Sequence, residues 1–239
     1  MTMKTIKLGL ASAITALLIT APAKAELIDS FNSGDTTVTT SGQGGIPVYN
    51  YFSDAGILGG ERLIRVRDGW SGTLGCCNNM TVENSAITNW GGNTAAESSI
   101  SYGSAINYNG QVSDGLNLSL SLDTLFEFDS INGDADEMSI SVNLLSGTGS
   151  SMSWFSNSIA VGTTSILLSD FTSANALALA DVDGISIQMH SKNVDEENGL
   201  TFQEFRFAES TPVNDVPEPT SLAVLALGLL GMRFRRVAK

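Results

Sequence analysis

Apolar and polar residues alternate with a period of two along several segments of this sequence, and this alternation constrains the fold more than any other feature. In residues 116–122 every second residue is leucine, and in residues 139–144 and 185–190 an aliphatic residue or methionine alternates with a polar one. Successive side chains of a β-strand point to opposite faces. Each segment therefore predicts an antiparallel strand with one buried face and one solvated face.

Several other segments favour strands over helices. Residues 126–128 begin a further strand, and the loop 132–137 is expected to join it to the strand at 139–144, so that 122–145 forms a hairpin. The apolar residues of 200–202 and of 205–207 have opposite parity, which predicts a β-bulge at residues 203–204. The only plausible short helix is 170–180. Shorter strands are expected at 27–31, 46–52, 62–67, 85–90, 99–107 and 164–168.

Many short strands separated by Gly-rich turns are typical of two packed antiparallel sheets. We therefore predict an all-β chain: an antiparallel β-sandwich of jelly-roll type over residues 26–211, flanked by an N-terminal signal helix and a short C-terminal apolar helix. The opening strand at 27–31, the turn at 58–62 and the closing strand at 200–202 make this layout similar to exported jelly-roll domains that bind carbohydrate. That likeness is at the level of the fold and assigns no site.

The N-terminal residues 1–25 have the parts of a secretory signal peptide in the right order. Lys4 and Lys7 precede the largely apolar run 8–21, and Ala23 and Ala25 are the small residues expected before a cleavage site. The mature chain is therefore expected to begin at Glu26, and the protein is expected to be exported through the inner membrane.

The C-terminus carries a second set of signals. Prolines in residues 212–219 predict an extended linker and exclude a helix before Thr220. The uncharged residues 221–232 predict a helix about 18 Å long at about 1.5 Å per residue, shorter than a bilayer core of about 30 Å. The basic residues after it favour the cytoplasmic side. The parts of this tail are Val216, Pro217, Glu218 and Pro219, then the apolar helix, then Arg233, Arg235 and Arg236.

This tail resembles the PEP-CTERM sorting signal of Gram-negative bacteria. The resemblance covers about the last tenth of the chain and is specific in the order and spacing of its parts. It implies that Pro217, Glu218 and Pro219 are recognised by exosortase, a membrane enzyme that removes the tail, and that the arginines within 220–239 retain it. Contact with the inner membrane would then be transient. It further implies a location at the cell surface or in the biofilm matrix, in company with exopolysaccharide. A plain C-terminal anchor and a frayed helix of the core are the alternatives for this tail.

The charge balance excludes several partners. The chain has a net charge of −13, and all of its 25 acidic residues except Glu218 lie in residues 26–215, where there are only five strong bases. Nucleic acids and anionic membrane surfaces both require a basic footprint. We therefore expect no nucleic-acid partner. The acidic surface suits solubility outside the cell or the binding of divalent cations.

The only two cysteines, Cys76 and Cys77, are adjacent. In an exported protein they could form a vicinal disulfide, remain free thiols, or pair with another chain. They do not predict a zinc site, because the single histidine, His190, lacks the usual ligand spacing.

No catalytic residue is predicted. His190 falls on the polar face of its strand and no nucleophile-elbow motif is present, while the many acids do not single out a glycosidase pair. No cofactor is expected, with the exception of calcium. Asn132, Asp134 and Asp136 alternate around a glycine and offer oxygen ligands, although a solvated turn explains the same residues and the spacing of an EF-hand is absent.

Two tryptophans are candidate glycan contacts. Trp90 lies among asparagines and glycines, and Trp70 lies beside Asp68 in a Gly-rich turn. The alternative for both is burial between two sheets. The sequence thus predicts a non-enzymatic exported protein of the cell surface or matrix that associates with extracellular polysaccharide. A secreted glycan-active enzyme and a purely structural matrix protein without a ligand are the alternatives.

Overall fold

A computed structural model describes residues 26–40, 46–68, 78–91, 96–108, 111–132, 138–191 and 199–210. Residues 24–210 form one compact unit. The predicted signal peptide, the linker and the C-terminal apolar helix lie outside the described residues.

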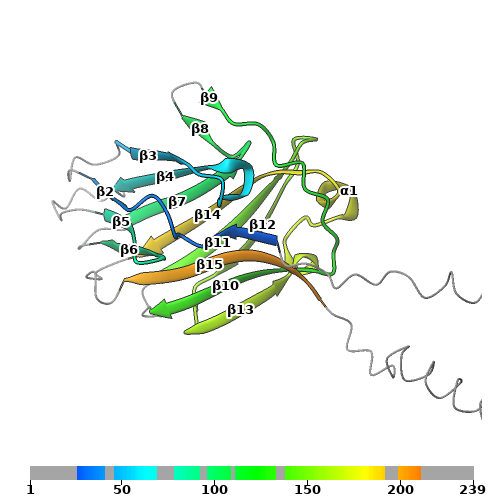
Figure 1. The fold of residues 1–239 in the computed structure, drawn as a ribbon. Helices are drawn as coiled ribbons and strands as arrows, with labels where there is room; N and C mark the ends of the chain where they lie inside the picture. Colours follow the sequence, from blue (N-terminus) through cyan, green and yellow to red (C-terminus); the bar gives the residue numbers. More distant parts are fainter. Residues whose placement is uncertain are drawn as a thin grey trace, which may run out of the picture. The chain divides into compact units, whose positions relative to one another are not determined.

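The first of two antiparallel sheets has seven strands (Figure 1). They follow the order β13-β10-β15-β6-β5-β2, and β1 pairs with β15 beside this path. The strands are β1 (Glu26–Asp29), β2 (Thr36–Thr39), β5 (Asn78–Glu83), β6 (Ala86–Gly91), β10 (Thr124–Asn132), β13 (Gly162–Leu167) and β15 (Leu200–Glu209).

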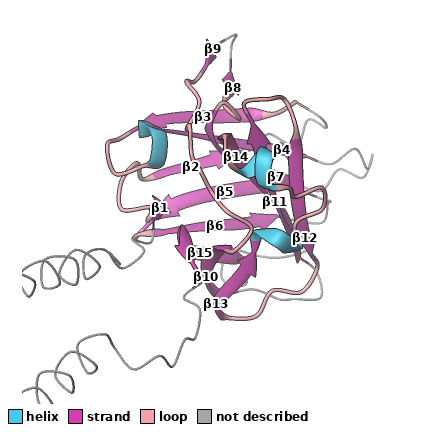
Figure 2. Cartoon of the chain, turned by 90° about the vertical axis from the view of Figure 1, so that its right-hand side faces the viewer, coloured by secondary structure: helices cyan, strands magenta, loops and turns pink. Residues whose placement is uncertain are grey.

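The second sheet has six strands in the order β12-β11-β14-β7-β4-β3 and packs against the first (Figure 2). Its strands are β3 (Val48–Ser53), β4 (Glu61–Asp68), β7 (Ala96–Gly103), β11 (Met138–Ser146), β12 (Ser151–Ser156) and β14 (Val182–Ser191). A two-stranded ribbon, β8 (Asn107–Tyr108) and β9 (Gln111–Val112), lies beside β3, and the short helical turns are η2 (Leu58–Gly60), η3 (Leu168–Asp170) and α1 (Ala176–Leu179). The prediction of an all-β antiparallel sandwich is confirmed.

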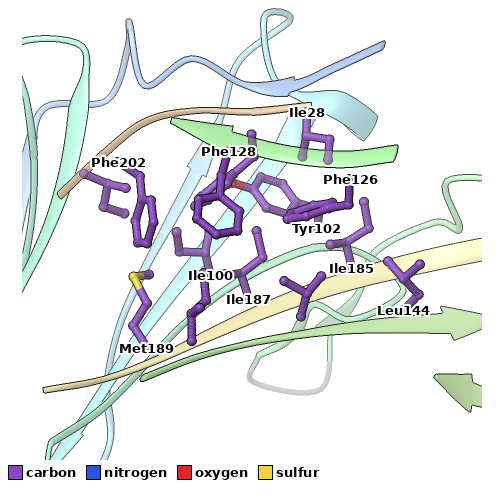
Figure 3. Close-up of a cluster of buried hydrophobic side chains, with 14 of the residues drawn as sticks. Ile28, Ile100, Tyr102, Phe126, Phe128, Leu144, Ile185, Ile187, Met189 and Phe202 are labelled. Carbon is purple, nitrogen blue, oxygen red and sulfur yellow. The ribbon is translucent and has the colours of Figure 1, made fainter. Parts of the chain in front are cut away.

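The core lies between the sheets and follows the period-two pattern. In β11, and in β14 from Ile185 onward, every second residue, including Ile140 and Ile187, is buried, while the residues between are partly exposed. Phenylalanines from β10 and β15 face them from the opposite sheet (Figure 3). Phe128 packs edge-to-face on Phe202 with ring centroids 5.4 Å apart. Burying each such side chain contributes about 1.5–3 kcal/mol, so the alternation accounts for the packing of the two layers.

The predicted hairpin over residues 122–145 is wrong. β10 and β11 are adjacent in sequence but belong to different sheets, so the connection between them passes from one layer to the other. The reason is that both strands have one apolar face. Placed in opposite sheets, the two faces pack against each other across the core, whereas the period-two pattern by itself is equally compatible with pairing in one sheet.

The predicted strand at 116–122 is also wrong. Only Leu118 pairs, through an isolated bridge to Val182, and Asn117 has a left-handed backbone (φ 53°) that interrupts the extended chain. The segment runs as a loop in which Leu118 enters the core, Leu116 and Leu120 pack against it, and Leu122 is exposed. Of the predicted helix at 170–180, only Ala176–Leu179 is α-helical.

The predicted bulge at residues 203–204 is confirmed. Asp129 pairs with Glu204 while the next residue of β10, Ser130, pairs with Phe202, so that Gln203 has no partner opposite it. The extra residue switches the parity of β15 and lets both Phe202 and Phe205 point into the core.

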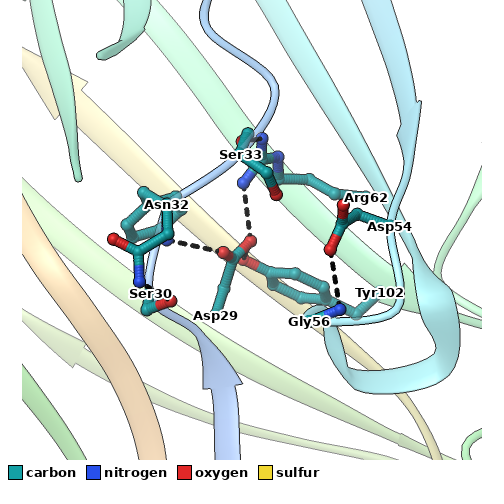
Figure 4. Close-up of polar contacts among 9 residues, drawn as sticks. Asp29, Ser30, Asn32, Ser33, Asp54, Gly56, Arg62 and Tyr102 are labelled. Atoms are coloured by element: carbon teal, nitrogen blue, oxygen red, sulfur yellow. Dashed lines mark hydrogen bonds and ion pairs between the residues drawn. The ribbon is translucent and has the colours of Figure 1, made fainter. Parts of the chain in front are cut away.

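A buried ion pair joins the two sheets near the N-terminus of the domain (Figure 4). Arg62 of β4 is fully buried and donates to Asp29 at the end of β1 (2.8 Å) and to the carbonyl oxygen of Ser33 (2.9 Å). Its guanidinium lies 5.5 Å from the ring centroid of Phe31. Tyr102 also donates to Asp29 (3.1 Å). Burial, followed by the charge of Asp29, raises the pKa of Tyr102 well above its ordinary value, so this hydroxyl remains a donor.

Candidate functional site

The outer face of the six-stranded sheet, on the side away from the core, carries an ordered array of polar side chains that we call the polar face. Alternate residues of each strand point to this side, and the strand register aligns them in rows across the sheet. From β12 to β3 one row is Phe155, Ser141, Gln188, Ser99, Arg65 and Tyr49. The neighbouring row is Ser153, Asn143, Ser186, Ser101, Leu63 and Tyr51.

The centre of the polar face consists of hydroxyl and amide groups. Ser141 contacts Gln188 at 3.4 Å, and Asn143 contacts Ser141 at 3.5 Å, both long for hydrogen bonds. A hydroxyl or an amide can both donate and accept. Because these groups hold one another only weakly, their hydrogen-bonding capacity remains available to a ligand rich in hydroxyl groups.

Aromatic side chains stand at both ends of the rows. Phe155 on β12 is 62% exposed and Tyr51 on β3 is 40% exposed, while Tyr49 beside Tyr51 is half-buried. Five inter-strand steps of about 4.8 Å separate the two ends by about 24 Å. An extended ligand lying across the strands would meet partly exposed polar groups on β11 and β14 and an apolar ring surface at each end, while Ser99, Ser101 and Leu63 of β7 and β4 are buried between them.

Charged groups are concentrated at the β7–β4 side of the polar face. Arg65 forms an ion pair with Glu97 of β7 (3.4 Å). Arg67 lies directly opposite Glu97 in the register, and His190 lies opposite Glu97 on its other side. His190 is therefore on the outer face of its strand, as the alternation predicts.

The β8–β9 end of the polar face is held by hydrogen bonds to Glu61. Ser113, which follows β9, donates a short hydrogen bond to Glu61, and the hydroxyl of Tyr51 also interacts with this carboxylate. The hydrogen bond from Ser113, and after it the one from Tyr51, lower the pKa of Glu61. The hydrogen bond to Glu61 in turn raises the pKa of Tyr51. The ring of Tyr51 is thus tethered at the edge of the face.

The residues singled out from the sequence lie elsewhere or outside the described part of the chain. Trp90 is on β6, in the opposite sheet, half-buried, and its indole nitrogen has no hydrogen-bond partner among the described residues. Asp68 and Asn132 end β4 and β10, and their side chains are not described. Trp70, Cys76, Cys77, Asp134 and Asp136 lie outside the described residues. Their glycan, disulfide and calcium roles remain predictions; in the described segments, no group of three metal-binding side chains is present.

The sequence contains a signal for the residues of the polar face. Tyr49 and Tyr51 have the parity opposite to Phe52, and Phe155 has the parity opposite to the core-packed Trp154. This parity indicates the outer side of a strand. The sequence does not indicate that β12 and β3 belong to the same sheet.

Comparison with known proteins identifies the end of the chain. Residues 215–237 match the family model of the PEP-CTERM protein-sorting motif. The chain carries a PEP-CTERM sorting signal. The PEP-CTERM signal marks an exported protein and confirms the resemblance drawn from residues 216–236. Within the described residues no helix has the length and apolarity needed to span a bilayer, and no curated protein is significantly similar to the chain.

Several solved structures are similar to this chain over most of its length. One is a family 11 carbohydrate-binding module of a cellulosomal cellulase from Clostridium thermocellum, with 14% identity, 81% of this chain and 99% of that chain covered, and a TM-score of 0.38. A xylan-binding module has 7% identity, 75% and 100% coverage and a TM-score of 0.32. The agarase AgWH50C has 13% identity, 57% and 22% coverage and a TM-score of 0.35. With scores below 0.5, the sandwich assignment rests on the strand order and register described above.

Proposed function

We propose that this protein, sorted by its C-terminal signal, is delivered to the cell surface or biofilm matrix and binds an extended polysaccharide across its polar face. The observation that carries the proposal is the row from Phe155 through serine and glutamine side chains to Tyr49. Sugar rings have apolar C–H faces and polar hydroxyl edges. Aromatic rings stack on the former and amides or hydroxyls bind the latter.

Binding without cleavage is the form of this function that the face supports best. Hydrolysis of a glycosidic bond requires two carboxyl groups about 5–10 Å apart, one of which acts as an acid. The described carboxylates of this face in β4 and β7 are Glu61 and Glu97. Glu61 accepts from Ser113 and has a lowered pKa, opposite to the shift of a general acid, and Glu97 is paired with Arg65. Release of reducing ends from a bound polysaccharide would instead favour a secreted glycan-active enzyme.

Removing the aromatic side chains should weaken this binding. We expect Tyr51→Ala and Phe155→Ala each to lower the affinity for the producing cells' own polysaccharide about tenfold, since each removes a stacking surface. The measurement is the retardation of the exported protein in native gels that contain the polysaccharide. Ile131→Ala is the matched control, because Ile131 is a similarly exposed apolar residue on β10 of the other sheet. Unchanged retardation of the double variant would contradict the site, and no retardation of the parent protein would favour a purely structural role.

The sorting signal makes a separate prediction about processing. We expect the protein recovered from the surface or medium to begin near Glu26 and to end near residues 217–220, through the action of a signal peptidase and an exosortase-type enzyme. Intact-mass spectrometry measures both ends at once. Deletion of the exosortase gene from the producing cells is the control and should restore the mass of the tail. A surface protein that retains Lys239 would show that the tail is a lasting anchor.

A further inference from the structure

We propose that the polysaccharide bound by the polar face is anionic and that Arg65 and Arg67 bind its acidic groups. This inference rests on the proposed function and adds the chemical class of the ligand. The domain has few basic residues, and the fold places them in different surroundings.

Two of the five bases in residues 26–215 are paired with acids elsewhere in the domain. Arg62 is buried between the sheets with Asp29. Arg206 lies on the outer face of the other sheet among three carboxylates, and its hydrogen bonds to Glu204 and then Glu127 raise its pKa. The contacts of Arg206 are Glu204 (2.7 Å), Glu127 (2.8 Å) and Asp129 (3.6 Å). Lys192 is outside the described residues.

The other two bases, Arg65 and Arg67, both lie on the polar face. They are alternate residues of β4, so their side chains emerge on the same side of the strand about 7 Å apart. A single carboxylate, Glu97, serves both positions: it forms an ion pair with Arg65 and lies opposite Arg67. Within the described residues Arg67 has no ion pair. Glu61, further along β4, accepts instead from Ser113 and Tyr51.

Arg65 and Arg67 balance Glu97 and Glu61, so this part of the face is close to neutral on a strongly acidic chain. A polyanion is repelled by the acidic surface elsewhere, because the chain has a net charge of −13. At the polar face it would meet two guanidinium groups, which bind carboxylate or sulfate through paired hydrogen bonds. Arg65 stands between Ser99 and Tyr49 in its row, so an acidic group bound there belongs to a sugar that also contacts the aromatic end.

The test compares polysaccharides that differ only in charge, with the exported protein as the binding partner. Polygalacturonate is set against its methyl ester, and dextran sulfate against dextran, which separates carboxylate from sulfate ester as the acidic group. We expect one charged member to bind at least about tenfold more tightly than its neutral counterpart. This advantage should shrink severalfold as sodium chloride rises from about 50 mM to about 500 mM.

Variants locate the effect. Arg65→Gln and Arg67→Gln should each weaken binding of the charged polysaccharide about tenfold, and Glu97→Gln should strengthen it severalfold. Arg206→Gln makes the same change in net charge on the opposite sheet and should leave the affinity unchanged. Binding of the charged probe that is insensitive to Arg65→Gln and Arg67→Gln would overturn the proposal.

The proposed function and this inference fail in different ways. Equal binding of a charged polysaccharide and its neutral counterpart, still weakened by Tyr51→Ala, overturns the anionic ligand and leaves the polysaccharide site in place. An absence of binding to all four probes and to the cells' own polysaccharide overturns both.

Discussion

Replacing Arg62 by methionine is expected to lower the free energy of unfolding by about 3–5 kcal/mol, because it leaves the carboxylate of Asp29 buried without its partner. Arg62 is fully buried, and Asp29 is 2% exposed. The side chain also joins β4 of one sheet to β1 of the other, so its loss affects the contact between layers. Urea denaturation followed by circular dichroism measures the change.

Two further variants make the result interpretable. Arg65→Met removes the same kind of side chain from the same strand, but its pair with Glu97 is partly exposed, and we expect a cost of less than about 1 kcal/mol. The double variant Asp29→Leu with Arg62→Met removes both charges and should recover part of the loss, the remainder reflecting the hydroxyl of Tyr102 and the N–H of Phe31, which lose their acceptor. If Arg62→Met costs no more than Arg65→Met, solvent reaches the pair and the buried-charge explanation is wrong.

Gly103→Ala is expected to cost about 3 kcal/mol or more, the second large effect on stability. Gly103 ends β7 with φ +58°, a left-handed conformation that costs an L-residue about 1–2 kcal/mol. A Cβ atom there would also lie 2.4 Å from the carbonyl oxygen of Asp183 and 2.4 Å from Cγ of Leu116. That carbonyl accepts from the backbone of Ser104 and Leu116, so it has little freedom to move. Thermal unfolding of the exported protein measures the effect.

Gly60→Ala separates the two contributions. Gly60 has a similar backbone angle (φ +78°), but a Cβ atom there would meet nothing within 4 Å. We expect Gly60→Ala to cost about 1–2 kcal/mol, the conformational part alone. Equal losses of stability in the two variants would show that Leu116 and Asp183, near the start of β14, can move aside at no energetic cost. That result would contradict the close packing seen at Gly103.

The strand faces were predictable from the sequence, because the side-chain period of a strand is a local property. The alternation in 139–144 and 185–190 correctly indicates which residues are buried, and the change of parity between Phe202 and Phe205 locates the bulge. The same rule fails at 116–122. There, the leucines at every second position belong to an extended loop that is not paired in a sheet. The left-handed backbone of Asn117 interrupts the strand conformation.

Strand partners were not predictable, because pairing depends on residues far apart in the chain. β10 and β11 are neighbours in sequence and were expected to form a hairpin, yet β10 pairs with β13 and β15 while β11 pairs with β12 and β14. The polar face depends on such long-range pairing. Tyr49 and Phe155 are more than a hundred residues apart, and only the intervening strands bring them into one row.

The sequence by itself determined the sorting signal, the all-β class and the side of each strand that is buried. Signals such as residues 216–236 are read as linear segments, and strand alternation is a property of neighbouring residues. Only the tertiary structure decided where the few basic residues lie, with Arg62 in the core, Arg206 among carboxylates and Arg65 on the polar face. Identical side chains acquire different roles because their charge compensation depends on strands that the fold, and not the sequence order, places beside them.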